Sequence, residues 1–328
     1  LFVIISFLCF YIIYIIILPL FLNQNFKNNH MGSKKNLVSI ILNCYNGEKY
    51  LRDALKSVKS QTYTNWELIF WDNRSNDNSK DILRSFKIKK IKYYLSKKHT
   101  SLYAARNLAM QKATGEFISF IDVDDLWEKN KLKKQIKLFN DKKTAVVYGN
   151  SWLKSEKFNK KKKFINYKVS GGYIYKNLIN RYNVGILTAM IKKSLLKKSK
   201  IIFNKKYDII GDFDFFLKLS KKYKFKFIQE PIATYRIHEN NLSFIKKDQQ
   251  IKELLHWLKK NKSNLSSSEY FNVKKRIFKS GFINIKFSKN FFDTFKYIIK
   301  FHKYIFNFKN IMILLSPTAL LRKLMWFS

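Results

Sequence analysis

Asp122 and Asp124 have the residue type and spacing best suited to chemistry in this chain. They follow a short run of apolar and small residues, 117–121, which is typical of a buried strand. Because unpaired charge is costly inside a buried strand, the acids must lie at its exposed carboxyl end. Residues two apart in an extended chain point the same way, and two converging carboxylates suit Mg²⁺ or Mn²⁺. The pattern predicts a metal site, with an acidic turn that only caps the next helix as the alternative.

The elements around this stretch alternate between strand and helix patterns. Strands are expected at 37–42, 66–71, 91–95, 117–121, 144–148, 187–191 and 224–228. Helices are expected at 47–60, around 82–86, and at 102–113, 129–139 and 211–221. Asp125 is expected to cap the helix that begins near Glu128, and the lysine-rich segment 154–163 to form a solvated hairpin or loop. Repeated β-α units predict an α/β fold with a Rossmann-like, mostly parallel, doubly wound sheet and helices on both faces.

Further polar segments are expected at the same edge of this sheet. The loop 43–48 lies between a strand end and a helix N-terminus, where an anion or nucleotide can bind. The second strand ends in Asp72-Asn73, and acids stand at the start of helix 211–221. In open parallel sheets ligands bind outside the carboxyl ends of the strands. These segments therefore predict a ligand site next to the two aspartates.

In this order and spacing, the sequence resembles the family 2 glycosyltransferases of the GT-A fold. The resemblance is carried by 38–51, 66–73, 105–107, 113–116, 122–127, 211–212 and 236–238. It covers 37–243, which we expect to form the glycosyltransferase domain. The resemblance implies a GT-A type fold, a nucleotide-sugar donor and sugar transfer with inversion at the anomeric carbon.

The resemblance also implies roles for individual residues. The nucleotide-sugar donor would be bound by Asn43, Tyr45, Glu48, Asp72, Asn73, Arg106 and Asp122. A divalent metal, Mn²⁺ or Mg²⁺, would be bound by Asp124 and approached by His238, and would neutralise the diphosphate leaving group. Asp212 would be the general base that deprotonates the acceptor hydroxyl.

Four of these assignments have alternatives. The family's base often follows Glu, whereas Gly211 precedes Asp212 here, so Asp214 is a rival for the base. Asn73 stands where the family often has a second acid, which leaves the identity of the nucleotide open. His238 could instead be a hydrogen-bonded structural histidine, and Arg106 a helix-surface arginine.

The composition is strongly basic, with 65 Lys and Arg against 22 Asp and Glu and a net charge of +43. Such a charge favours anionic partners. However, the abundance of Lys, Asn, Ile, Phe and Tyr reflects AT-rich codons, so part of the charge carries no functional information. Two cysteines are too few for a disulfide framework, which favours a reducing compartment, and no zinc-ligand spacing is present.

The two ends of the chain have their own patterns. Segment 1–30 is a hydrophobic N-terminal segment that is either a membrane anchor or an upstream stretch misassigned as coding, since the first methionine is Met31. Segment 245–328 is expected to be a basic amphipathic helical tail, with helices at 250–260, 267–279, 289–307 and 310–326. Lysines among aromatic residues suit an anionic membrane surface, although these helices could simply pack against the catalytic domain.

These features predict an enzyme at the cytoplasmic face of the inner or plasma membrane. Its acceptor would be a glycan or a lipid-linked molecule in surface polysaccharide or lipopolysaccharide synthesis, and no nucleic acid partner is expected. The alternative is a basic nucleic-acid- or membrane-binding protein with a degenerate nucleotide site. A glycoside hydrolase fits less well, because two acids on one strand cannot flank a sugar from opposite faces. A nucleotidyltransferase would share the metal-binding acids but release pyrophosphate.

Overall fold

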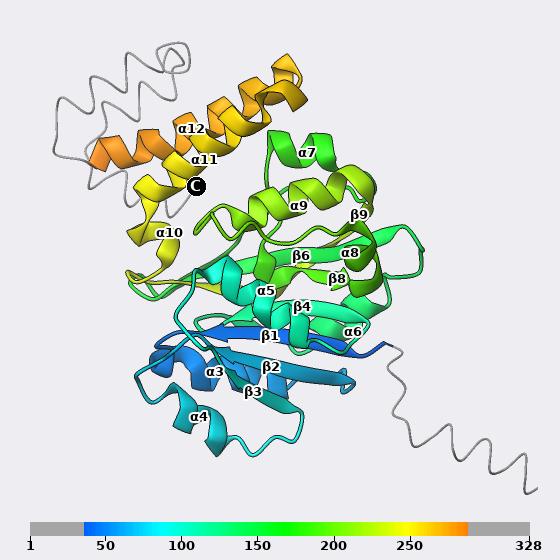
Figure 1. The fold of residues 1–328 in the computed structure, drawn as a ribbon, viewed down its shortest axis with the longest axis vertical. Helices are drawn as coiled ribbons and strands as arrows, with labels where there is room; N and C mark the ends of the chain where they lie inside the picture. The colour runs from blue at the N-terminus through cyan, green and yellow to red at the C-terminus, as the bar shows by residue number, and fades with distance from the viewer. Residues whose placement is uncertain (1–35, 288–328) are drawn as a thin grey trace, which may run out of the picture.

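The computed structural model describes residues 36–287 and builds them around one mixed sheet of nine strands. The strand order is β3-β2-β1-β4-β8-β6-β9-β5, with β7 paired to β6. Figure 1 shows the part of this order that runs from β3 through β2, β1, β4 and β8 to β6. The strands are β1 (Val38–Cys44), β2 (Trp66–Asp72), β3 (Ile91–Leu95), β4 (Phe117–Asp122), β5 (Leu126–Trp127), β6 (Thr144–Ser155), β7 (Lys160–Lys163), β8 (Met190–Lys192) and β9 (Lys224–Ile237). The predicted α/β class is confirmed.

The helices cover both faces of this sheet. They are α3 (Glu48–Lys59), α4 (Ser79–Ser85), α5 (Leu102–Lys112), α6 (Lys131–Ile136), α7 (Tyr175–Asn180), α8 (Lys193–Ser199), α9 (Gly211–Lys222), α10 (Leu242–Ile245), α11 (Lys247–Asn261) and α12 (Ser267–Phe287), with 3₁₀ turns η2 (Ile186–Thr188) and η3 (Lys262–Asn264). Alternate strand residues point to opposite faces. Side chains of α3, α4 and α6 therefore share one core with half of the strand residues, and those of α5, α7 and α9 share another with the rest.

The second half of the sheet differs from the parallel arrangement that we expected. Strands β1 to β4 pair in parallel, but β8 runs antiparallel to both β4 and β6. Strands β6 and β9 pair in parallel and are much longer than predicted. We expected this strand to end at Ile228, shortly before Pro231, and proline cannot donate to a strand ladder. Instead the ladder shifts register where Asn150 meets Pro231, and a bulge of this kind lets the strand continue.

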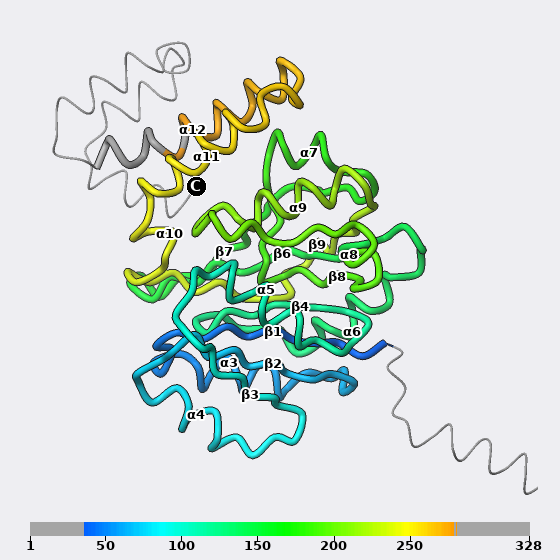
Figure 2. The backbone as a smooth tube through the Cα atoms, viewed as in Figure 1, coloured from blue at the N-terminus to red at the C-terminus, as the bar shows by residue number. Residues whose placement is uncertain are grey.

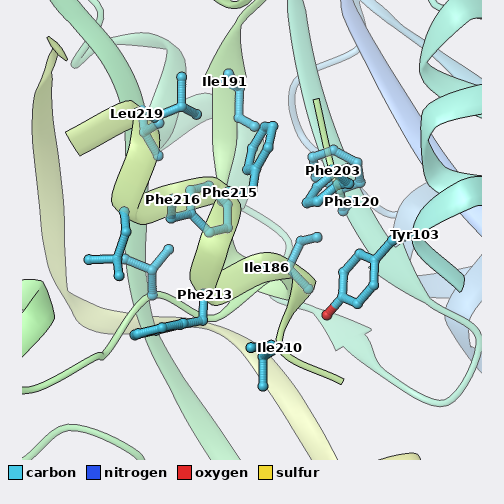
Figure 3. Close-up of a cluster of buried hydrophobic side chains, with 14 of the residues drawn as sticks. Tyr103, Phe120, Ile186, Ile191, Phe203, Ile210, Phe213, Phe215, Phe216 and Leu219 are labelled. Carbon is cyan, nitrogen blue, oxygen red and sulfur yellow. The ribbon is translucent and has the colours of Figure 1, made fainter. Parts of the chain in front are cut away.

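Aromatic side chains fill the core under α5 and α9. Figure 3 shows Phe213, Phe215 and Phe216 of α9 near Phe203 and Tyr103. The rings of Phe203 and Phe215 are stacked with their centroids 4.0 Å apart. This packing fixes the beginning of α9, where Asp212 lies, against α5, which carries Arg106.

Helices α11 and α12 lie side by side (Figure 2) and complete the same core. Six of their side chains are buried in it, namely Leu254, Trp257, Leu258, Val273, Ile277 and Phe278. In the part of the chain that the structure describes, the expected tail therefore packs against the domain it follows. The expected segment 1–30 and the helices expected at 289–307 and 310–326 lie outside the described residues. Within 36–287, no helix is both long and apolar enough to cross a membrane.

Candidate active site

The carboxyl ends of β1, β2 and β4 meet at one edge of the sheet. In the parallel ladders Cys44 pairs with Asp72, and Asn43 pairs with Asp122. The ends align because all three strands run the same way and stop at matching register positions. This edge brings together most of the side chains that the sequence analysis singled out.

Asp124 contacts His238 at this edge. Its Oδ2 lies 3.0 Å from Nε2 of His238 and accepts a hydrogen bond of 3.2 Å from Nδ2 of Asn241. The backbone N–H of His238 in turn donates to Oδ1 of Asn241 at 2.7 Å, so Asn241 fixes both partners. Burial, and next the charge of Asp122, raise the pKa of Asp124, whereas the bond to His238 lowers it.

The two aspartates reach this arrangement differently from our expectation. Strand β4 ends at Asp122, and the N–H of Asp125 donates back to the carbonyl of Asp122, which closes a turn. Asp122 and Asp124 are therefore not in one extended segment, and the argument from alternation was wrong. Asp122 bonds to Arg106 while Asp124 bonds to His238, although their charges still interact.

Asp125 is not the helix cap that we expected. It is buried, and its Oδ1 accepts a hydrogen bond from the backbone N–H of Arg236 at 3.0 Å. Burial, together with the charges of Asp124 and Asp122, raises its pKa well above the usual range. Helix α6 begins after Asn130 instead. Asp125 thus joins the turn after β4 to β9, and His238 directly follows that strand.

The Asp124 and His238 pair fits a cation that receives its remaining ligands from a substrate. No group of three or more His, Cys, Asp or Glu side chains gathers within residues 36–287, so the described protein offers no complete cage. Mg²⁺ is commonly held by one or two carboxylates together with substrate phosphates. One carboxylate and one imidazole at the edge of the sheet are compatible with this arrangement.

Arg106 is buried and is not a helix-surface residue. Its Nη2 lies 2.6 Å from Oδ1 of Asp122, and its guanidinium carbon lies 5.2 Å from the centre of the Tyr103 ring. The Arg106 side chain is 3% exposed, whereas that of Asp122 is 31% exposed. The pair thus presents one accessible carboxylate, held in place by a buried cation.

The side chains of Asp72 and Asn73 form hydrogen bonds with neighbouring segments of the chain. Asp72 accepts hydrogen bonds from the N–H of Ser75 at 2.7 Å and from the hydroxyl of Tyr93 at 2.8 Å. The Asn73 amide donates to the carbonyl of Thr100 at 2.8 Å and accepts from its N–H and hydroxyl. These bonds connect the end of β2 to the segment after it, to β3 and to the segment before α5.

The loop after β1 has both free and bonded groups. Tyr45 is 53% exposed, and the centroid of its ring lies 4.3 Å from that of His99. Glu48 instead accepts two hydrogen bonds from Asn78, so it braces the start of α4. The side-chain nitrogen Nδ2 of Asn43 is buried and has no hydrogen-bond partner among the described residues. His99 lies far from β1 in the sequence, and our sequence analysis missed it.

Asp212 lies at the start of α9 and is partly accessible. Its Oδ1 accepts a hydrogen bond from the N–H of Phe213 at 2.7 Å and one from the hydroxyl of Tyr103 at 3.4 Å. Burial raises the pKa of this carboxyl, and the bond from Phe213 and the charge of Arg106 oppose that rise. A partly accessible carboxylate with a raised pKa is suited to accept a proton.

Asp214, the rival for the base, has both oxygens occupied. Oδ2 lies 2.5 Å from Nζ of Lys218, and Oδ1 accepts a hydrogen bond of 2.9 Å from Nε1 of Trp257. The residue is 3% exposed. This geometry favours Asp212 as the residue that can meet a substrate.

Glu253 of α11 holds the segment before Asp212. Its carboxylate accepts hydrogen bonds from the backbone N–H groups of Asp208, Ile209 and Ile210, at 2.7 to 3.1 Å. Sequence reasoning missed Glu253, whose signal was an acid placed among the apolar residues of an amphipathic helix. The segment before α9 is thus held by a residue of α11 that lies 43 positions beyond Ile210 in the sequence.

Comparisons with known proteins agree with this architecture. Residues 39–216 match the family model described as Glycosyl transferase family 2. A UDP-Glc:alpha-D-GlcNAc-diphosphoundecaprenol beta-1,3-glucosyltransferase, WfgD of Escherichia coli, is 33% identical over 52% of this chain and 66% of its own length. A putative teichuronic acid biosynthesis glycosyltransferase, TuaG of Bacillus subtilis, is 30% identical over 65% of this chain and 84% of its own.

Solved structures share the fold at low sequence identity. Residues 1–349 of TarS from S. aureus superpose with a TM-score of 0.57 at 17% identity, over 82% of this chain and 80% of that one. The mannosyltransferase PcManGT from Pyrobaculum calidifontis, solved with GDP-Man and Mn²⁺, gives 0.54 at 14% identity, over 89% and 87%. The chain therefore belongs to glycosyl transferase family 2, has the GT-A fold and is a glycosyltransferase.

Proposed function

We propose that the protein transfers a sugar from a nucleotide-diphosphate sugar to an acceptor hydroxyl, with inversion and with the help of Mn²⁺ or Mg²⁺. The observation that carries this proposal is a continuous set of contacts between the edge acids and the candidate base. Asp122 pairs with Arg106, Arg106 lies against Tyr103, and the Tyr103 hydroxyl bonds to Asp212. A donor at the edge and an acceptor near Asp212 would thus share one site.

The donor would lie along the carboxyl edge with its diphosphate near Asp124 and His238. These two residues would hold the metal, which supplies positive charge to the diphosphate leaving group. Asp122 would meet the ribose, held there by Arg106. Tyr45 and His99 offer an exposed aromatic surface on the loop side of the same edge, where a nucleobase could lie flat.

Asp212 would act on the acceptor. As the acceptor oxygen attacks the anomeric carbon, its proton passes to the Asp212 carboxylate. The bond from the anomeric carbon to the diphosphate oxygen breaks, and its electron pair leaves with the nucleoside diphosphate. A single displacement of this kind inverts the anomeric configuration. The hydrogen bonds from Phe213 and Tyr103 to Oδ1 orient the carboxylate for this step.

The relatives suggest the kind of pathway. WfgD is named for a diphosphoundecaprenol-linked acceptor and TuaG for teichuronic acid synthesis. We therefore place the reaction in cell-surface polysaccharide synthesis, with a glycan or lipid-linked acceptor at the cytoplasmic face of the membrane. The exposed apolar residues Leu242, Phe244 and Ile245 of α10, followed by two lysines, support contact with an anionic membrane surface.

The proposal is tested by measuring nucleoside diphosphate release from UDP- and GDP-linked sugars, with and without a chelator. We expect release that requires a divalent metal and is lost in Asp124→Ala. Pyrophosphate release would favour a nucleotidyltransferase. Binding to duplex DNA that weakens steeply with salt, with no donor turnover, would favour the nucleic-acid-binding alternative.

A further inference from the structure

Arg276 of α12 packs against two aromatic rings, Phe213 and Tyr182, next to Asp212. Its guanidinium carbon lies 4.8 Å from the centre of the Phe213 ring and 5.0 Å from that of Tyr182. The two rings contact each other edge to face, with centroids 5.3 Å apart. Phe213 directly follows Asp212 and donates its N–H to the Asp212 carboxylate. Arg276, which follows Asp212 by 64 positions in the sequence, thus contacts the two rings next to the candidate base.

The positive charge of Arg276 has no direct carboxylate partner. Within the described residues, no ion pair and no side-chain hydrogen bond joins it to an acid. In contrast, Arg106 of α5 forms an ion pair with Asp122, and Lys218 of α9 forms one with Asp214. Burial lowers the pKa of Arg276, and the nearby Tyr182 and Asp212 raise it. A guanidinium tolerates this setting because it is weakly hydrated and stacks on rings.

Asp212 likewise has no cation within ion-pair distance among residues 36–287. The titratable and charged groups that face it are Tyr103 and Arg106 from α5, Tyr182 from the segment before η2, and Arg276 from α12. Burial raises the pKa of Asp212, and the N–H of Phe213, Arg106 and Arg276 lower it, in that order. Of the two arginines, Arg106 is neutralised by its ion pair with Asp122, whereas Arg276 has no such ion pair among the described residues.

We propose that Arg276 is a positioning residue of the active site, which supplies from the C-terminal helix the charge that keeps the Asp212 carboxylate ionised. The proposal rests on the assignment of Asp212 as the base. A protonated carboxylic acid cannot take the acceptor proton, so a partly buried base needs an opposing charge. The helix pair α11 and α12 follows residues 39–216, which match the family model, and would thereby complete the site.

A double-mutant cycle on thermal stability tests the charge coupling without any turnover. The variants are Asp212→Asn, Arg276→Met and the two combined, and methionine keeps apolar contact with the rings. At neutral pH we expect the two shifts in Tm to be non-additive by on the order of 2–4 °C. The coupling should vanish at acidic pH, where Asp212 is protonated. Additive shifts at both pH values would overturn the proposal.

Lys218→Met provides the matched control in the same cycle. Lys218 lies on α9, the helix that also carries Asp212, but pairs with Asp214. Its effect should add to that of Asp212→Asn. Coupling as strong as that of Arg276 would mean that the cycle reports general helix charge, and this would contradict a specific role for Arg276.

The pH profile of kcat/KM tests the catalytic consequence. In Arg276→Met the acid limb should move to higher pH, with kcat/KM at a pH on that limb falling roughly tenfold for each unit of movement. Arg276→Lys should restore much of the lost activity, and donor KM should not change. An unmoved limb with a higher acceptor KM would overturn the proposal and assign Arg276 to acceptor binding. If the wild-type protein transfers no sugar, the proposed function fails, while the stability cycle still decides the role of Arg276.

Discussion

Nε1 of Trp257 donates a hydrogen bond of 2.9 Å to Oδ1 of Asp214, across 43 residues of sequence. This bond joins α11 to the start of α9. Glu253, also on α11, accepts hydrogen bonds from three backbone N–H groups just before α9. Asp214 therefore has a structural partner on each oxygen, and Asp212 keeps an accessible carboxylate. The relationship separates two acids that the sequence alone leaves as rivals.

The first prediction separates these two acids by substitution. Asp212→Asn should lower kcat by about 10²- to 10⁴-fold, because it removes the proton acceptor, and should leave donor affinity nearly unchanged. Asp214→Asn should instead lower the free energy of unfolding by about 1–3 kcal/mol, since it weakens buried hydrogen bonds. Steady-state kinetics and chemical unfolding of both variants measure the difference. Loss of turnover in the Asp214 variant, with a folded and active Asp212 variant, would reverse the assignment.

The second prediction concerns the C-terminal helices. A chain that stops at Ile245 should fail to fold cooperatively, because it exposes the face that α11 and α12 cover. Burying a large apolar side chain is worth about 1.5–3 kcal/mol, and six such residues of these helices lie in the core. Circular dichroism during heating measures the outcome. A cooperative transition close to that of the full chain would show that the helices are dispensable.

The third prediction concerns the buried ion pair. Arg106→Met should lower the free energy of unfolding by about 3 kcal/mol. This is the lower end of the cost of removing one partner of a buried ion pair, because Asp122 is partly exposed. Asp122→Asn should lower the free energy of unfolding further, since it leaves the buried guanidinium of Arg106 without its partner. The combination should recover part of the loss. Urea unfolding of all three variants checks this order, and equal effects of the two single changes would argue against it.

The fourth prediction is a pH dependence of stability. Burial alone would raise the pKa of Glu67, but Lys92, Ser39 and Thr114 hold it at about 2. A carboxyl with a lowered pKa in the folded state stabilises the protein above its unfolded pKa, and that contribution disappears as the pH falls toward about 2. Glu67→Gln should therefore cost about 2–3 kcal/mol at neutral pH.

The control for this prediction is the same comparison in acid. The difference in unfolding free energy between wild type and Glu67→Gln should shrink steadily below about pH 4.5. Lys92 is 45% exposed, so added salt should weaken only its share of the effect. A difference that stays constant from neutral pH to pH 3 would contradict the assigned pKa.

Particular residues show what the sequence could predict. The buried strand that ends at Asp122 follows from local pattern, because apolar periodicity and the cost of buried charge act over a few residues. The direction of Asp124 does not, since a turn after Asp122 replaces the extended chain. The continuation of β9 past Pro231 depends on a bulge against β6, which no local rule predicts.

The residues that the sequence analysis missed act across long separations. Asn241 orients Asp124 from 117 positions away, and Tyr103 reaches Asp212 across 109. Such contacts depend on how α5, α9 and β9 pack against one another, and no short sequence motif predicts that packing. The resemblance could name Asp212 and His238, but it could not name the side chains that hold them.

The most direct test of this account is the binding of nucleoside diphosphates to the purified protein, measured by thermal stabilisation with and without Mn²⁺ or Mg²⁺. The account predicts a shift with UDP or GDP that needs the metal, is lost in Asp124→Ala and persists in Asp212→Asn. A metal-independent shift, or no shift in a folded protein with either nucleotide, would contradict the assignment of Asp124 and His238 as the metal site of a sugar-nucleotide transferase.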